Sequence, residues 1–257
     1  MSKLPKEHRF IDFSDYGRPL ARLIANSLKN TSFTPIHVTI SFIISGLLGV
    51  FFIVKGCYWY AAFFLILKSI LDAADGELAR IKKQPSYTGR YFDSISDIIL
   101  NALIFISIWL VVNSNIWILI FSFFGLQLQG TLYNYYYTIL RNKLDGDKTS
   151  RVFEDKAPIA LEGEKQDNVN TCFFIYKILY GTFDKIIYKL DRKAEIDSKI
   201  PNWLMTCIST FGLGFQLLFI SAMLVAGLID YILYFILIYT VFVFIFIGTR
   251  KVFCWVN

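Results

Sequence analysis

Four aspartates in the stretch 72–97 are the residues most able to act together chemically. Asp72 and Asp75 are three residues apart, and Asp93 and Asp97 are four residues apart, so the carboxylates of each pair share one face of a helix. Only a short segment separates the two pairs, which predicts two antiparallel neighbouring helices. Asp72 and Asp97 then lie deepest, and the four carboxylates are expected to converge at about the same depth.

The apolar runs around these residues make such a cluster costly. A carboxylate well inside hydrocarbon costs about 2.5–3.5 kcal/mol on insertion scales, and four carboxylates also repel one another. Protonation would relieve the repulsion, and so would a divalent cation, which accepts oxygen ligands. Mg²⁺ combines a few carboxylates with substrate phosphates, and Arg80 could receive such a phosphate. Lys68 lies four residues before Asp72, so a plain salt bridge to Asp72 is the alternative.

Small and polar residues surround the aspartates. Gly76 and Ala79 flank the first pair and leave room for a ligand to approach the backbone closely. Gly89 opens the second helix, where a bulky side chain would narrow the site, and Ser86 offers a hydroxyl in the connecting loop. A single glycine in a membrane helix is more often a packing residue, and that interpretation stays open for Gly76 and Gly89.

The elements that must position these residues are expected to be membrane helices. The 257 residues are 55% hydrophobic and only 18% charged, against roughly 25% charged in soluble domains. This composition excludes a disordered chain, a collagen-like chain and an ordinary cytosolic enzyme. We predict an all-α polytopic membrane protein, because six stretches come near the roughly 20 residues that a span needs. These transmembrane helices are expected at about 36–54, 57–78, 92–112, 115–138, 203–226 and 228–249.

Two further helices are expected to lie on the membrane surface. In 17–29, apolar residues recur at helical spacing with basic residues on the other faces, which predicts an amphipathic interfacial helix. A helix packed on a soluble core is its alternative. The cytoplasmic connection 141–202 is polar at first, and 173–190 predicts a second interfacial helix, or one helix in a solvated linker. Residues 1–32 thus form a tail with an amphipathic helix, and 33–257 form the six-span domain.

The distribution of Lys and Arg predicts the orientation. With a cytoplasmic N-terminus and six spans, all but two of the 26 basic residues, Lys55 and Lys68, fall on the cytoplasmic side. Both termini and the aspartates then face the cytoplasm, and a bacterial inner membrane is the expected location. The net charge of +6 is explained by this topology and by affinity for anionic lipid, without a nucleic-acid partner. The four scattered cysteines, at 57, 172, 207 and 254, suggest neither a disulfide framework nor a zinc site.

The stretch 72–97 resembles the CDP-alcohol phosphotransferase family. The family motif is D-x2-D-G-x2-A-R-x8-G-x3-D-x3-D, and every fixed position is matched, at Asp72, Asp75, Gly76, Ala79, Arg80, Gly89, Asp93 and Asp97. The six spans and the preceding amphipathic helix are similar too. One position departs, because Ile36 stands between Pro35 and Thr39 where members often have Asn. His37 beside it is expected at the headgroup boundary and not as a base.

The resemblance implies a transferase of substituted phosphate groups that uses Mg²⁺ or Mn²⁺. In such an enzyme a CDP-linked donor binds with its pyrophosphate over one or two metals, an alcohol oxygen attacks the β-phosphorus, and CMP leaves. The aspartates at 72, 75, 93 and 97 would hold metal, and Asp97 would also be the catalytic general base. The residues implied to contact the CDP moiety are Gly76, Ala79, Arg80, Ser86 and Gly89.

The implied partners are a CDP-linked lipid donor, a small alcohol acceptor and membrane lipids, in phospholipid synthesis. The short chain with six spans favours CDP-diacylglycerol as donor, and CDP-choline or CDP-ethanolamine transfer to diacylglycerol is the alternative. Because the family often forms homodimers, a second copy is a further candidate partner. A phosphorylated acceptor would need extra cations, for which the candidates are Lys82, Lys83, Arg90, Arg141 and Arg151.

Two other classes of protein compete with an enzyme. The carboxylates could line a cation or proton pathway in a small transporter, but that function predicts acidic residues spread through the bilayer depth. Here they gather at one end of their helices. A structural membrane scaffold would leave the four carboxylates without a purpose.

Overall fold

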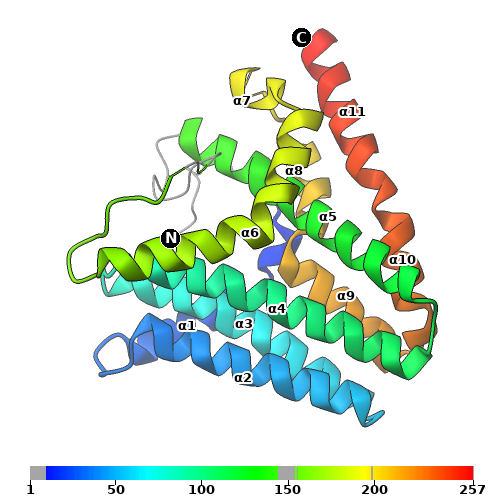
Figure 1. The fold of residues 1–257 in the computed structure, drawn as a ribbon, viewed down its shortest axis with the longest axis horizontal. Coiled ribbons are helices and arrows are strands. Elements are labelled where there is room, and N and C mark those ends of the chain that lie inside the picture. Colours follow the sequence, from blue (N-terminus) through cyan, green and yellow to red (C-terminus); the bar gives the residue numbers. More distant parts are fainter. Residues whose placement is uncertain (1–9, 144–153, 155, 198, 257) are drawn as a thin grey trace.

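The computed structural model describes residues 10–143, 154, 156–197 and 199–256, and in this part all regular structure is helical (Figure 1). A short 3₁₀ turn, η2, comes before the first helix, and a second, η3, lies between α8 and α9. The elements are η2 (Phe13–Asp15), α1 (Arg18–Leu28), α2 (Pro35–Val54), α3 (Tyr58–Ile81), α4 (Tyr87–Val112), α5 (Ile116–Lys143), α6 (Gln166–Leu190), α7 (Lys193–Asp197), α8 (Asn202–Ile208), η3 (Ser209–Phe211), α9 (Leu213–Val225), α10 (Ile229–Tyr239) and α11 (Val241–Val256).

Tight turns join the long helices into antiparallel pairs. The turn between α2 and α3 contains Gly56 at φ 71°, and the turn between α9 and α10 contains Gly227 at φ 73°, a left-handed conformation that favours glycine. Asn113 ends α4 in the same conformation, at φ 52°. These short turns make hairpins of α2 with α3, of α4 with α5, and of α9 with α10.

Helix α2 packs against both α3 and α4, and small residues allow the close approach. A Cβ added to Gly49 would lie 2.8 Å from a methyl group of Leu65 on α3, and one added to Gly46 would lie 2.8 Å from a methyl group of Leu100 on α4. These two glycines thus set how near α3 and α4 come to α2, and so fix the frame that carries the aspartates.

Helix α1 packs on the C-terminal half of α3, which carries the first aspartate pair. Its small face is fully buried, with Ala21 and Ala25 against Ala74 and Leu78 of α3. Its opposite face exposes apolar side chains, including Leu23 at 66%. A helix is therefore present where the sequence predicts one, with one face on the bundle and apolar side chains exposed on the other, and its place at a membrane surface stays a prediction.

In the described part, four helical segments are long and apolar enough to cross a membrane. They are Pro35–Val54, Tyr87–Val112, Ile116–Lys143 and Ile229–Phe253. A fifth is obtained if Asn202–Phe211 and Leu213–Val225, which are bent by 53°, count as one span. The six spans predicted from the sequence are thus supported for four or five. The remaining one, α3, carries Lys68, Asp72 and Asp75 within its length.

The expected continuous span 203–226 is broken at Gly212. The N-terminal segment fits into this break, where the Phe13 backbone N–H donates to the Ser209 hydroxyl at 2.9 Å. A Cβ on Gly212 would clash with Ser14. The break makes room for a segment that is distant in sequence, and hydrophobicity along the chain gave no sign of it.

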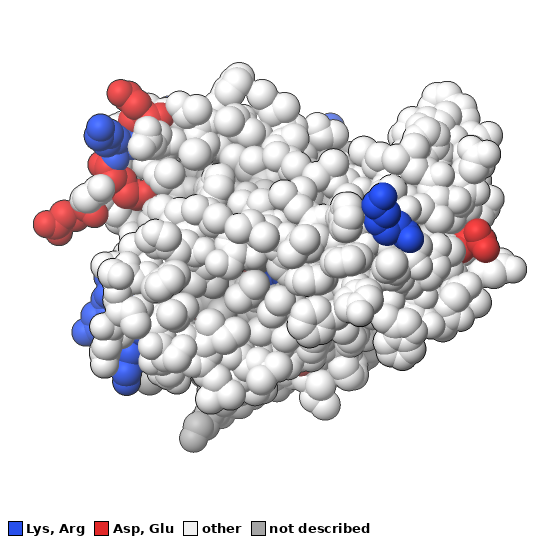
Figure 2. Space-filling view, turned by 90° about the horizontal axis from the view of Figure 1, so that it is seen from below, with Lys and Arg blue, Asp and Glu red and all other residues white. Residues whose placement is uncertain are grey.

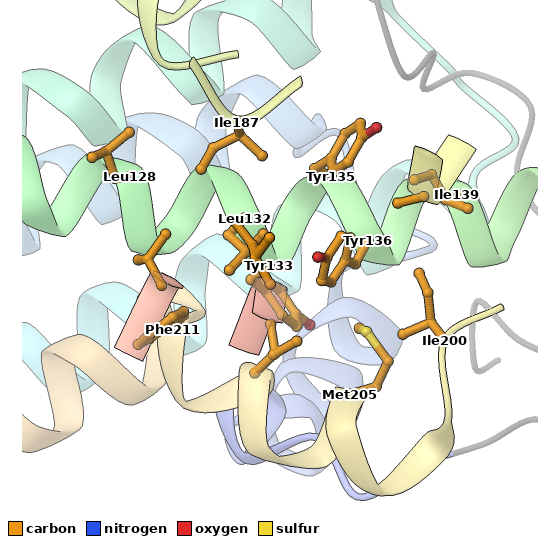
Figure 3. Packing of buried hydrophobic residues seen from close by; sticks show 14 of the residues in the cluster. Leu128, Leu132, Tyr133, Tyr135, Tyr136, Ile139, Ile187, Ile200, Met205 and Phe211 are labelled. Atoms are coloured by element: carbon orange, nitrogen blue, oxygen red, sulfur yellow. The ribbon is translucent and has the colours of Figure 1, made fainter. Parts of the chain in front are cut away.

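The helices on either side of the connection after α5 are longer than predicted. Helix α5 continues to Lys143, and α6 begins at Gln166, ahead of the expected start at 173, and ends at Leu190. Aliphatic and aromatic side chains of α5 pack with Ile187 of α6 and with Met205 and Phe211 (Figure 3). Arg250 of α11 forms a buried ion pair with Asp191, which also accepts a hydrogen bond from the Tyr136 hydroxyl at 2.6 Å. These contacts fix α6 against α4 and α5.

The surface matches an integral membrane protein. Figure 2 shows a face that is almost free of charged residues over its middle, with most of its Lys, Arg, Asp and Glu gathered near one end. Large apolar side chains are exposed along α2 and the first half of α3, including Ile44, Phe51, Trp59 and Phe63. Such extensive exposed apolar surface suits contact with lipid.

Candidate active site

Three of the four predicted aspartates come together between α3 and α4. Asp72 and Asp75 of α3 and Asp93 of α4 each offer a carboxylate oxygen, and these oxygens all lie within 4.8 Å of one another. The helical spacing places the α3 pair on one face, and the hairpin turns α4 back so that Asp93 meets them. A group of this size suits a divalent cation with oxygen ligands.

The Asp75 carboxylate is held by α2. The Thr39 hydroxyl donates a hydrogen bond to Asp75 Oδ2 at 2.7 Å, and both side chains are buried. Ile36, at the position that departs from the family pattern, is exposed. His37 accepts a hydrogen bond from the Thr34 backbone N–H at 3.0 Å as part of the α2 capping box. Of this stretch, Thr39 therefore supports the site, and His37 lies outside it.

Asp93 supplies the observation that best tests the fit of a cation. Its Oδ1 atom is buried and has no hydrogen-bond partner among the described residues. Buried carboxylate oxygens almost always have a partner. A divalent ion between Asp72, Asp75 and Asp93 would satisfy this oxygen and offset the repulsion among the three carboxylates, so these residues fit a metal site.

Asp97 lies one turn further along α4 and outside this group of three. Its carboxylate forms an ion pair with the Lys68 ammonium, and Lys68 is fully buried. The same ammonium is 3.8 Å from Asp72 Oδ2. The salt bridge considered between Lys68 and Asp72 is therefore present, but Lys68 makes its closer contact with Asp97.

The aspartates line a cavity of about 530 Å³. The motif residues in its wall are Asp72, Asp75, Gly76, Arg80, Asp93 and Asp97. Arg80 reaches the cavity from the end of α3, and its Nη2 atom lies 3.2 Å from Glu77 Oε1. A Cβ on Gly76 would stand 3.7 Å from the Arg80 guanidinium, so glycine keeps the space beside this cation open.

Three of the residues expected to contact the CDP moiety are not in the cavity wall: Ala79, Ser86 and Gly89. Ser86 is the N-cap of α4, accepts a hydrogen bond from the Gly89 backbone N–H at 2.8 Å and donates to Glu164 at 2.8 Å. A Cβ on Gly89 would lie 3.1 Å from the Ser86 hydroxyl oxygen. The local structure thus gives Ser86 and Gly89 a capping role, and their contact with a nucleotide stays a prediction.

The comparison with known families agrees with this geometry. The sequence model of the family described as CDP-alcohol phosphatidyltransferase matches residues 32–184, more than half of the chain. The chain belongs to the CDP-alcohol phosphatidyltransferase family. The family implies transfer of a phosphoalcohol group from a CDP-alcohol in a membrane protein, with a divalent metal. A search of curated proteins found no match.

The cavity is also lined by residues that sequence analysis did not single out. They include Asp12, Ser14, Asp15 and Arg18 from the N-terminal segment, Glu154, and Tyr176, Tyr180 and Asp184 of α6. Asp12 accepts hydrogen bonds from the Tyr133 hydroxyl at 2.6 Å and from the Ser14 hydroxyl at 2.8 Å. The polar run 12–15 before an amphipathic helix was a usable signal for the first group, whereas Glu154 lies in a polar connection with no pattern.

The cations considered for a phosphorylated acceptor are mostly engaged by protein groups. The Nη2 atom of Arg90 donates to both carboxylate oxygens of Glu154, at 2.6 and 2.7 Å. The Lys82 ammonium donates to two backbone carbonyls of the loop before α2. Arg141 lines the cavity, where its Nη2 donates to the Thr138 hydroxyl at 3.3 Å and its guanidinium lies over the ring of Tyr137. Arg151 lies outside the described residues.

Helix α6 places an acidic group opposite the motif aspartates. Asp184 lines the cavity, and burial together with the negative charge of Glu154 raises the pKa of its carboxyl to about 7. The cavity wall on this side therefore changes its charge near neutral pH. The pKa of Glu164, which lies in the loop before α6 and contacts the start of α4, shifts in the opposite direction. Burial acts to raise its pKa, but hydrogen bonds from Thr88, Ser86 and Tyr87 outweigh burial and lower it.

Proposed function

We propose that this chain is a phosphatidyl transferase that moves the phosphatidyl group of CDP-diacylglycerol to the hydroxyl of a small polar alcohol and releases CMP, in phospholipid synthesis. The observation that carries this proposal is the group formed by Asp72, Asp75 and Asp93, with the unpartnered buried oxygen of Asp93, in the wall of a cavity that also holds Arg80. The enzyme is then a transferase of substituted phosphate groups.

The lining of the cavity supports a polar acceptor. One turn beyond Asp97 on α4, Asn101 lines the cavity together with Gln127 of α5 and Gln216 of α9. Amide groups of this kind suit hydrogen bonding to hydroxyls. A diacylglycerol acceptor, as in transfer from CDP-choline or CDP-ethanolamine, would bring apolar chains against these groups, and we therefore rank that alternative second.

The proposed roles follow from position and chemistry. Asp72, Asp75 and Asp93 would hold Mg²⁺ or Mn²⁺, which supplies positive charge to the pyrophosphate oxygens when bound. Arg80 would bind a phosphate oxygen, and Gly76 leaves room beside it, with Ala79, Ser86 and Gly89 toward the nucleotide end. Asp97 would take the proton of the acceptor hydroxyl. The hydroxyl oxygen forms a bond to the β-phosphorus as the bond from that phosphorus to CMP breaks.

The proposed topology has six spans. We assign α3 as the additional span, because Lys68 and Asp75 are buried and its polar side chains line the cavity, away from lipid. The bent pair α8 and α9 is one span, and α10 with α11 is another. Both termini and the cavity then face the cytoplasm of a bacterial inner membrane.

Labelling of single cysteines tests this topology. In a variant without native cysteines, a cysteine at Gln84, in the α3–α4 turn, should react with a membrane-impermeant maleimide only in inside-out vesicles. A matched cysteine at Asn115, in the α4–α5 turn, should react only in right-side-out vesicles. The opposite pattern would invert the topology, and reaction of both from one side would exclude a spanning α4.

CMP release tests the activity. Purified full-length protein is incubated with CDP-diacylglycerol, a panel of small alcohols and Mg²⁺ or Mn²⁺. CMP should be released with one class of alcohol, and EDTA or the substitution Asp75→Asn should abolish its release. Release without metal would contradict the proposed site. Release only from CDP-choline or CDP-ethanolamine with diacylglycerol would replace the proposed donor by the alternative.

A further inference from the structure

Lys68 is a cation built into the aspartate cluster. It lies on α3, one turn before Asp72, and none of its side chain is exposed. Its ammonium pairs with Asp97, stands 3.8 Å from Asp72 Oδ2, and lies 5.0 Å from the centroid of the Phe42 ring. A buried ammonium is strongly disfavoured unless carboxylates surround it, so these contacts fix both its charge and its place.

This position is where a second metal ion would be expected. In two-metal sites the ions stand about 3.5–4 Å apart and share carboxylate ligands. Here Asp72, Asp75 and Asp93 form one group, whereas Asp97 lies apart from it and is already paired. The Lys68 ammonium contacts Asp97 and approaches Asp72, the two carboxylates between which a second ion would lie.

We propose that the Lys68 ammonium takes the place of a second metal ion, so that this site binds a single divalent ion through Asp72, Asp75 and Asp93. This inference rests on the proposed function. A second divalent ion would have to sit against the buried ammonium, and like charges at contact distance repel strongly where water is excluded. Lys68 also holds the Asp97 carboxylate in the cavity wall through their ion pair, and it is in this sense a positioning residue.

The number of bound ions tests this inference without measuring activity. Mn²⁺ binding to the purified full-length protein is followed by calorimetry and by electron paramagnetic resonance. The wild type should bind one Mn²⁺ per chain, with the spectrum of an isolated ion. Lys68→Met, which removes the charge and keeps a long flexible side chain, should bind two ions, with the exchange-coupled spectrum of a close pair. Lys185→Met, a lysine of the same cavity wall, should bind one.

Each outcome separates this inference from the proposed function. Two ions in the wild type would overturn the role of Lys68 and leave the proposed transferase intact. No ion in any of the proteins would overturn the metal site and the proposed function with it. A single ion in folded Lys68→Met, bound as in the wild type, would show that Lys68 does not exclude a second ion. If Lys68→Met does not fold, Lys68→Arg, which keeps the charge, must still bind one ion, and two ions there would overturn the inference.

Discussion

At the scale of single residues, the site depends on what each carboxylate contacts. Asp72, Asp75 and Asp93 face one another, Asp75 is oriented by Thr39, and Asp97 is paired with Lys68. The four aspartates, all predicted to hold metal, thus divide into a group of three and a single carboxylate paired with Lys68. This division suggests separate tasks, holding metal for the three and accepting a proton for Asp97.

Replacing Asp97 should separate these tasks. Asp97→Asn removes the carboxylate that would accept the hydroxyl proton, so CMP release should fall by about 10²-fold or more. Mn²⁺ binding measured by calorimetry should persist, because Asp97 is outside the group of three. Asp93→Asn serves as the control that should lose both properties. An Asp97→Asn enzyme with wild-type turnover would remove Asp97 from the reaction.

The Thr39 hydroxyl should tune the metal affinity. Thr39→Val keeps the shape of the side chain but removes the hydrogen bond to Asp75, and loss of a group that orients a metal ligand typically weakens binding by about 10–100-fold. The Mn²⁺ dissociation constant measures the effect. Thr249→Val is the matched control, because within the described residues the Thr249 hydroxyl bonds only to the Ile245 carbonyl of its own helix, and it should leave the Mn²⁺ dissociation constant unchanged. Equal affinities in both variants would contradict the proposed support of Asp75.

At the scale of elements, the loop before α6 holds the start of α4. The Glu164 carboxylate accepts hydrogen bonds from the Ser86 hydroxyl and from the backbone N–H groups of Tyr87 and Thr88, at 2.7–3.1 Å. A negative group at a helix N-terminus satisfies its free N–H groups and interacts favourably with the helix dipole. Glu164 thereby joins the polar connection to the helix that carries Asp93 and Asp97.

Neutralising Glu164 should weaken this junction in a pH-dependent way. Its pKa is lowered in the folded protein, so its stabilisation is present above its ordinary pKa of about 4.3 and is lost as pH falls through the folded value. Glu164→Gln should cost about 1 kcal/mol at neutral pH, on the scale of a helix cap, and the difference from wild type should shrink in acid. Thermal unfolding in detergent measures it. Exposed Glu162→Gln is the control, and an equal effect there would contradict the capping role.

The break between α8 and α9, into which the N-terminal segment packs, is a second contact between distant elements. A Cβ on Gly214 would clash with the Ser14 backbone, whereas one on Gly248 of α11 would meet nothing within 4 Å. Gly214→Ala should therefore destabilise the protein by about 1–3 kcal/mol through overpacking. It should also displace the segment that brings Asp12 and Asp15 to the cavity. Thermal unfolding measures the loss of stability, and limited proteolysis of the N-terminus measures the displacement of this segment. A Gly248→Ala variant that loses as much stability as Gly214→Ala would contradict this account.

At the scale of the whole molecule, sequence periodicity predicted the parts that depend on local pattern. It predicted the paired aspartates and the helices from α2 to α5, because apolar runs and helical spacing are visible within one segment. It missed the break at Gly212, the entry of residues 12–15 into the cavity, and the contacts of Glu154 and Glu164. Each of these pairs residues that are far apart in the chain, and hydrophobicity within a segment carries no information on such partners.

The ion pair of Lys68 with Asp97 is another contact between two helices that the pattern within one segment does not show. The spacing of Lys68 to Asp72 predicted an ion pair within α3, but the hairpin brings Asp97 of α4 nearer. Packing of α2 against both α3 and α4 sets this distance, so the electrostatics of the site depends on the arrangement of three helices. The family motif is visible in the sequence, whereas the separation of Asp97 from the other three aspartates follows from the fold.

The most direct test of the central claim is anomalous diffraction from crystals of the protein grown with Mn²⁺ and CDP-diacylglycerol. The account predicts an anomalous peak bonded to carboxylate oxygens of Asp72, Asp75 and Asp93 and to the pyrophosphate, with Arg80 on the same phosphates. A peak elsewhere in the protein, or a donor bound away from these three carboxylates, would contradict it.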